Sequence, residues 1–127
     1  MLDLMTQEDR KKLSAIPVLK PRHIEWGGGN KTEDGVIIMP YPIYDDEIYD
    51  WMKAVEETGL MDHDYLDHME ALKDKPVDTL TAEEIMTRFT YYLRGERFCD
   101  GTIAAAVERG EIEALGTRLQ ELLAERR

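Results

Sequence analysis

Apolar residues over most of the chain recur at the three-to-four-residue spacing of amphipathic helices. The spacing predicts a helix over 45–59, a shorter one over 64–73, two more over 81–95 and 101–109, and a last helix after Gly110. The predicted core of these helices consists of Ile48, Trp51, Met52, Val55, Ile85, Phe89, Leu93, Phe98, Ile103, Val107, Ile112, Leu115, Leu119 and Leu122. This pattern favours one continuous core between packed helices.

Capping signals mark where several helices begin. Thr81 is followed three residues later by Glu84, which is the pattern of a capping box. A similar signal at Thr6 predicts a short helix near the N-terminus. We expect Gly95 to end the helix that Thr81 begins, and Asp100 to cap the next one with its side chain.

A different pattern comes before the long helices. Residues 23–26 alternate between polar and apolar, and residues 36–39 are mostly β-branched, which is typical of strands. The sequence therefore predicts an antiparallel β-hairpin over 22–39. The expected buried residues of this hairpin are Ile24 and Ile38. The proline-rich segment 40–44 is expected to be an extended connector, because proline cannot donate to a strand ladder.

Together these elements indicate an α+β fold that is mainly helical, with one N-terminal β-hairpin. A chain of 127 residues is long enough to bury one core. We see no internal repeat and no linker, and we therefore expect a single domain over 1–127, in which 45–127 forms the helical part.

The net charge of −11 is concentrated in the middle of the chain. Residues 33–84 contain 3 Lys and Arg against 16 Asp and Glu, while 85–127 contain 7 of each and 1–32 are slightly basic. Such an acidic face attracts a basic protein partner and disfavours nucleic acid, because phosphate binding needs Lys and Arg. Two alternatives stay open. The acids can serve solubility alone, and the arginine-rich C-terminal third can bind nucleic acid.

Composition also bounds the setting of the protein. No apolar run reaches the ~20 residues of a membrane span, and the N-terminus lacks the apolar stretch of a signal peptide. The single cysteine, Cys99, excludes an intrachain disulfide and fits a reducing compartment. We therefore expect a cytoplasmic protein without a membrane partner, present as a monomer or a weak homodimer.

No cofactor or metal is predicted. The glycine run 27–29 lacks the Gly-Lys-Ser/Thr sequence of a phosphate-binding loop. His63 and His68 are five residues apart, which places them on different faces of a helix. Asp64 and His68 are four residues apart and can pair, but two groups make a weak site.

The densest polar cluster lies between two predicted helices and contains Arg94, Glu96, Arg97 and Asp100, with Phe98 among them. It has two interpretations. In the first, the cluster is a structural clasp in which a buried Arg97 pairs with a carboxylate from another element. In the second, it is a polar pocket in which arginine holds an anionic group. We expect the clasp.

Aromatic residues form a second candidate binding group, made of Trp26, Tyr41 and Tyr44. The two tyrosines lie in an irregular segment between prolines. Partly exposed aromatic side chains in such segments often line binding grooves. These three residues are therefore candidates for contact with a ligand or a partner.

A family resemblance is carried by residues 94–101, which read Arg-Gly-Glu-Arg-Phe-Cys-Asp-Gly, and by the small residues and the Arg-Leu pair in the helices that follow. This combination resembles a bacterial family catalogued as a domain of unknown function numbered 6508. The likeness covers approximately residues 46–120, and Leu66 stands where relatives carry tryptophan. The resemblance implies the extent of the unit and a bacterial or mobile-element origin, and it implies no activity.

Two functions are favoured over nucleic-acid binding by these observations. The first is a non-catalytic binding module that offers its acidic face to a basic protein. The alternative is a small-molecule-binding protein or an enzyme that uses the Arg94, Glu96, Arg97 and Asp100 cluster. The sequence shows no pairing of nucleophile and base and no cofactor motif, and we therefore favour the first.

Overall fold

The computed structural model describes residues 6–29, 33–37 and 39–124. Its fold is mainly helical with one short antiparallel hairpin near the N-terminus, as the sequence predicts. The elements follow one another in the order α1 (Gln7–Ser14), β1 (Glu25–Gly27), β2 (Tyr41–Ile43), α2 (Asp46–Glu57), α3 (Tyr65–Leu72), the 3-10 turn η2 (Val77–Thr79), α4 (Ala82–Glu96), α5 (Thr102–Glu108) and α6 (Glu111–Ala124). Within the described part of the chain, no helix has both the length and the apolar character that a membrane span requires.

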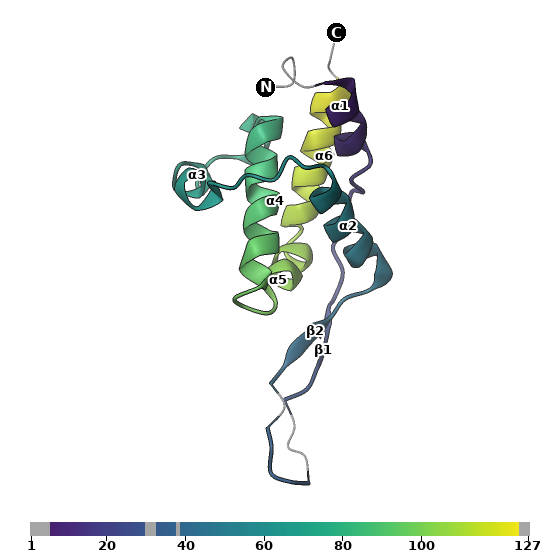
Figure 1. Cartoon of the computed structure of the whole chain (residues 1–127), viewed down its shortest axis with the longest axis vertical. Coiled ribbons are helices and arrows are strands. Elements are labelled where there is room, and N and C mark those ends of the chain that lie inside the picture. The colour runs from purple at the N-terminus through teal and green to yellow at the C-terminus, as the bar shows by residue number, and fades with distance from the viewer. Residues whose placement is uncertain (1–5, 30–32, 38, 125–127) are drawn as a thin grey trace.

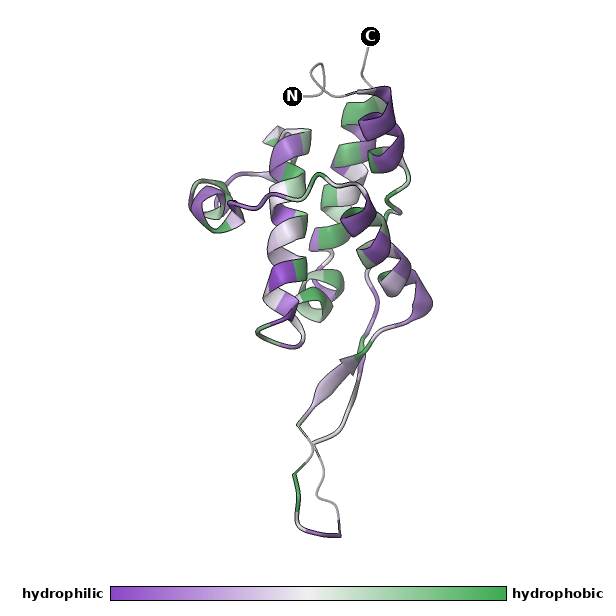
Figure 2. Ribbon diagram, in the orientation of Figure 1, coloured by the Kyte–Doolittle hydropathy of each residue, from purple (hydrophilic) through white to green (hydrophobic). Residues whose placement is uncertain are grey.

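Helix α4 is the centre of the helical body and packs against α3, α5 and α6 (Figure 1). The fully buried indole of Trp51, on α2, meets the ring of Phe89, on α4, edge-on with ring centroids 5.2 Å apart. Apolar residues are concentrated on α5 and α6 (Figure 2), where Ile103, Leu115 and Leu119 are fully buried. The core therefore runs between α2, α4, α5 and α6, as the helical spacing predicts.

The last helix closes against the beginning of the chain. Helix α6 packs on α1, and Gln120 Nε2 donates a hydrogen bond of 3.4 Å to the carbonyl oxygen of Ile16. Arg118 Nε donates one of 3.2 Å to the carbonyl oxygen of Leu80, just before α4. Helix α6 thus joins the two ends of the described chain to its middle.

Both predicted capping signals are present. Before α4, Thr81 Oγ1 accepts a hydrogen bond of 3.1 Å from the N–H of Glu84, and Glu84 Oε1 accepts one of 2.9 Å from the N–H of Thr81. Thr6 and Asp9 make the same reciprocal pair before α1. Each pair satisfies two N–H groups that the helix itself leaves without an acceptor.

The end of α4 differs from the prediction. Gly95 remains helical, and the helix continues to Glu96. Phe98 therefore falls in the turn after the helix and is 86% exposed, so its predicted place in the core is wrong. Met52 and Leu122 are only partly buried against the core. The other predicted core residues of the helices, Ile48, Trp51, Val55, Ile85, Phe89, Leu93, Ile103, Val107, Ile112, Leu115 and Leu119, are buried, as is Ile24 in the segment before β1.

The hairpin uses a different second strand from the predicted one. Strand β1 pairs antiparallel with β2, with Trp26 opposite Pro42, whereas the prediction placed the second strand at 36–39. Ile37 makes only an isolated bridge, and Ile38 lies outside the described residues. The apolar residues of the predicted strand that are described are all exposed: Val36, Ile37 and Met39. Proline is tolerated in β2 because each strand of a two-stranded sheet is an edge strand.

The contrast between the two phenylalanines gives a test of this core. Replacing Phe89 with alanine leaves a cavity beside Trp51 and should lower the free energy of unfolding by about 3–5 kcal/mol. Phe98→Ala should change it by less than about 0.5 kcal/mol, because the side chain is already in solvent. Urea unfolding followed by circular dichroism measures both values. Equal losses for the two variants would contradict the core described here.

Candidate functional site

Two of the predicted groups of residues meet where α4 turns into α5. The carboxylate of Glu96 accepts a hydrogen bond of 2.9 Å from the Tyr44 hydroxyl. It also accepts bonds of 3.0 and 2.8 Å from the N–H groups of Gly101 and Ile103. The Tyr44 oxygen in turn accepts a bond of 3.1 Å from the N–H of Ala104. The first turn of α5 is therefore capped by a side chain from α4 and by one from the segment after β2.

Asp100 does not cap α5, contrary to the prediction. The cap position is Gly101, whose φ of 98° lies in the left-handed region that favours glycine. A Cβ atom at Gly101 would stand 2.6 Å from the Trp26 ring, so the missing side chain also makes room for the indole. Trp26 thereby joins the base of the hairpin to the turn between α4 and α5.

The environment of Tyr44 keeps its phenol protonated. Burial of the hydroxyl and its hydrogen bond to the Glu96 carboxylate raise the pKa of Tyr44 well above its ordinary value. The hydroxyl therefore remains a donor to Glu96 and an acceptor from Ala104. Ionisation of the phenol therefore does not disrupt this contact at moderate pH.

The remaining predicted site residues do not join this contact. Arg97 is exposed, and its side chain makes no hydrogen bond or ion pair with another described residue, so its expected burial and pairing are wrong. Arg94 is half-buried and Asp100 is exposed. Tyr41 lies over the backbone of Gly27, within 2.7 Å of where a Cβ atom would stand, and is 47% exposed. A clasp does join α4 to α5, but hydrogen bonds to Glu96 form it, and ligand binding by the predicted set stays a prediction.

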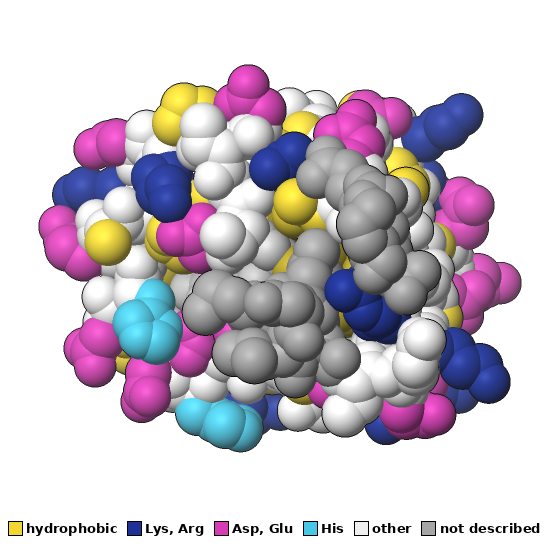
Figure 3. Space-filling model, turned by 90° about the horizontal axis from the view of Figure 1, so that it is seen from above, with side chains coloured by type: hydrophobic (Ala, Val, Ile, Leu, Met, Phe, Trp, Pro, Cys, Tyr) yellow, Lys and Arg dark blue, Asp and Glu magenta, His cyan; other side chains and the backbone are white. Residues whose placement is uncertain are grey.

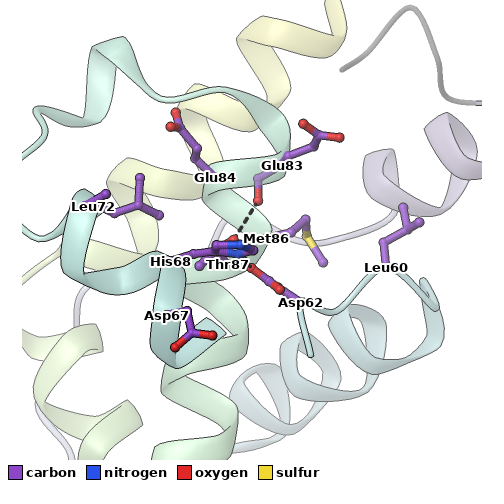
Figure 4. Close-up of a pocket in the computed structure, with 10 residues that line it drawn as sticks. Leu60, Asp62, Asp67, His68, Leu72, Glu83, Glu84, Met86 and Thr87 are labelled. Carbon is purple, nitrogen blue, oxygen red and sulfur yellow. Dashed lines mark hydrogen bonds and ion pairs between the residues drawn. The ribbon is translucent and has the colours of Figure 1, made fainter. Parts of the chain in front are cut away.

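A groove of about 660 Å³ lies between α3 and α4, and the loop after α2 contributes one wall (Figure 4). The apolar lining comes from Leu60, Ala71, Leu72 and Met86. The polar lining comes from Asp62, Asp67, His68, Glu83, Glu84 and Thr87. We name this feature the α3/α4 groove.

Asp62 organises the polar wall of the α3/α4 groove. Its Oδ2 atom lies 2.6 Å from His68 Nδ1 and accepts a hydrogen bond of 2.6 Å from the Thr87 hydroxyl. Its Oδ1 atom accepts one of 2.9 Å from the N–H of Asp64, and its own N–H donates one of 3.0 Å to Thr90 Oγ1. Figure 4 shows His68, from α3, and Thr87, from α4, converging on this carboxylate.

The pair of Asp62 and His68 favours the charged form of both groups. Burial opposes the charge of Asp62, but hydrogen bonds from His68 and Thr87 outweigh it, and the pKa of the carboxyl lies below its usual range. The hydrogen bond to Asp62, followed by the negative charge of that carboxylate, raises the pKa of His68. The imidazole nevertheless remains 57% exposed beside the groove.

Helical spacing alone does not find this pair. It suggests Asp64 as the partner of His68, whereas the partner is Asp62, six residues before the histidine and ahead of α3. The side chain of Asp62 folds back onto the N–H of Asp64, a turn that aspartate commonly forms. An aspartate three residues before the first residue of α3 is therefore the only local signal.

The groove has a polar lining that is mainly acidic and in which no side chain is placed as a nucleophile. Its lining has four carboxylates, of which Glu84 pairs with Lys75 at 2.8 Å. Thr87, the hydroxyl in the lining, already donates to Asp62 and is not placed as a nucleophile. Among the described residues no group of three or more His, Cys, Asp or Glu side chains is arranged to hold a metal ion.

Comparison with protein families gives one match. The model of a family of unknown function, DUF6508, matches residues 5–125. The chain belongs to this family. The match confirms the resemblance and extends it beyond 46–120, so that the matched range includes the hairpin residues. No curated protein and no solved structure matches the chain.

The clasp in this member of DUF6508 is testable by two substitutions in α4 and the turn after it. Glu96→Ala removes the acceptor of three hydrogen bonds and should lower the free energy of unfolding by about 2–3 kcal/mol. Arg97→Ala removes no side-chain hydrogen bond or ion pair with a described residue and should cost less than about 0.5 kcal/mol, because Arg97 is exposed. Thermal melts compare the two. A larger loss of stability in Arg97→Ala than in Glu96→Ala would contradict this clasp and support the Arg97 ion pair that the sequence predicts.

The pair of Asp62 and His68 predicts a pH dependence with a definite sign. Because the pKa of His68 is raised on folding, protonation favours the folded state below about pH 6.5, the ordinary histidine pKa. This contribution is lost as the pH rises through the folded-state pKa. The stability difference between the wild type and His68→Gln should therefore shrink from acid to alkaline pH. An NMR titration should show a lower pKa of His68 in Asp62→Asn, and an unchanged pKa would contradict the pairing.

Proposed function

We propose that this protein is a non-catalytic binding module and that its α3/α4 groove receives a basic segment of a partner protein. The observation that carries the proposal is the combination of an apolar floor with acidic side chains around it. Leu60 and Ala71 supply the accessible apolar surface of the groove, above the buried side chains of Leu72 and Met86. Asp67 and Glu83 lie on opposite sides of His68 (Figure 4). A lysine or arginine side chain fits such a groove, because its stem packs on apolar atoms while its charge meets carboxylates.

The distribution of charge supports a basic partner at this location. The groove is built entirely from residues 60–87, which lie almost wholly in the segment that carries a net −13. The end of the molecule that carries the two termini shows acidic and basic side chains interspersed (Figure 3). Long-range attraction should therefore draw a basic protein toward residues 33–84, which include nearly all of the groove lining, and should speed the encounter.

The enzyme alternative has less support. The alternative would use the cluster of Arg94, Glu96, Arg97 and Asp100, but the oxygens of Glu96 already bind backbone N–H groups and the Tyr44 hydroxyl. Arg97 and Asp100 lie exposed in the turn that follows. We therefore place the binding activity in the α3/α4 groove. We further propose a bacterial protein of the cytoplasm, where an exposed free thiol such as that of Cys99 stays reduced.

Binding of a synthetic lysine- and leucine-rich peptide, labelled with a fluorophore and followed by anisotropy, tests the proposal. The wild type should bind it at low salt, and the affinity should fall as salt rises, because part of the attraction is screened. Asp67→Asn should weaken binding by about two- to fivefold, the scale of one exposed charge pair. Ala71→Trp should abolish it by filling the groove without a change of charge.

Asp50→Asn is the matched control for these variants. Asp50 is exposed on α2, outside the groove, and its substitution removes the same charge. It should leave the affinity unchanged. If Asp50→Asn weakened binding as much as Asp67→Asn did, or if Ala71→Trp had no effect, the attraction would be diffuse and the α3/α4 groove would not be the site.

A further inference from the structure

The hairpin carries most of the exposed apolar surface of the described chain. Helices bury their apolar side chains in the body, whereas the hairpin projects from it along the longest axis of the molecule (Figure 1). We define the arm as the described residues from Glu25 to Ile43. Six of the eleven exposed large hydrophobic residues lie in the arm: Trp26, Val36, Ile37, Met39, Tyr41 and Ile43. Apolar side chains gathered in this way mark a surface that another molecule covers.

We propose that the arm is a dimerisation element, which pairs with the arm of a second copy of this chain. In the described chain the sheet contains β1 and β2 alone, so each strand has an open outer edge with unpaired backbone groups. A two-stranded hairpin is marginally stable by itself in water. Pairing of one arm with another satisfies these edges and covers the exposed side chains of both.

The charge distribution permits a second copy in this arrangement, because most of the negative charge lies outside the arm. Between Glu25 and Ile43 the sequence carries four charged residues, Glu25, Lys31, Glu33 and Asp34, with a net charge of −2, so most of the −11 of the whole chain lies outside the arm. Two bodies of this charge repel each other, but antiparallel arms keep them at opposite ends of the dimer. The three residues of β1 alone span roughly 10 Å, which exceeds the screening length of ~8 Å at physiological salt.

The available area indicates a weak dimer. A buried aromatic side chain covers ~150–250 Å², so the exposed halves of Trp26 and Tyr41 offer roughly 200 Å² per copy. The four exposed aliphatic side chains add a similar area at roughly 60–120 Å² for each fully exposed chain. The total of about 800 Å² for two copies lies in the range of weak contacts, to which backbone hydrogen bonds between edges add. The dimer should therefore dissociate on dilution.

A concentration series on the full chain tests the inference. The mass from light scattering should rise with concentration toward twice that of one chain. Trp26 is 47% exposed and Trp51 is fully buried, so a shift of tryptophan emission to shorter wavelength should accompany the rise and should be absent in Trp26→Phe. High salt should leave the dimer intact, because the contact is apolar and because salt screens the repulsion between the two acidic bodies.

Variants locate the contact. Met39→Lys combined with Ile43→Lys places charges on the arm and should hold the protein monomeric at every concentration, with the helical circular dichroism unchanged. Leu66→Lys is the matched control, because Leu66 is 71% exposed on α3, outside the arm. This variant should dimerise like the wild type. A wild type that stays monomeric at the highest concentration, or a dimer that persists in the double lysine variant, would overturn the inference.

Discussion

One carboxylate fixes the relation between the hairpin and the helical body. Glu96 receives the Tyr44 hydroxyl from the segment after β2 and two N–H groups from the start of α5. An isolated helix of seven residues is unstable in water, and α5 therefore depends on this capping and on its buried face. The direction of α5 sets the position of α6, and with it the closure of the core.

The sequence predicts the helices well because each carries two consistent signals. At α4, the capping box of Thr81 and Glu84 agrees with the apolar stripe that follows. The prediction that α4 ends at Gly95 is wrong, because glycine weakens a helix by only about 1 kcal/mol, and Gly95 packs closely against Thr102 on α5. The prediction of the second strand at 36–39 is wrong for a related reason. Rules against proline describe central strands, and they do not apply to an edge such as β2.

The candidate sites show what sequence spacing cannot provide. Glu96 and Tyr44 are separated by 52 positions, and no local pattern indicates that they meet. The α3/α4 groove depends likewise on a loop that brings Asp62 against Thr87, 25 residues later. Sequence did identify Trp26, Tyr44 and Glu96 as notable residues. Their contacts, however, show that two of them hold the fold together, because the backbone donors of α5 compete for the same oxygens that a ligand would use.

The closure of α6 on α1 has a consequence for synthesis of the chain. The hydrogen bond between Gln120 and Ile16 joins residues 104 positions apart, and α6 also packs beneath α4 and η2. A chain that is still on the ribosome has made α1, α2 and α4 before the residues of α6 have emerged, and these helices then expose their apolar faces. The core can therefore close only after the residues of α6 have emerged, and docking of α6 on the earlier helices becomes the step that completes it.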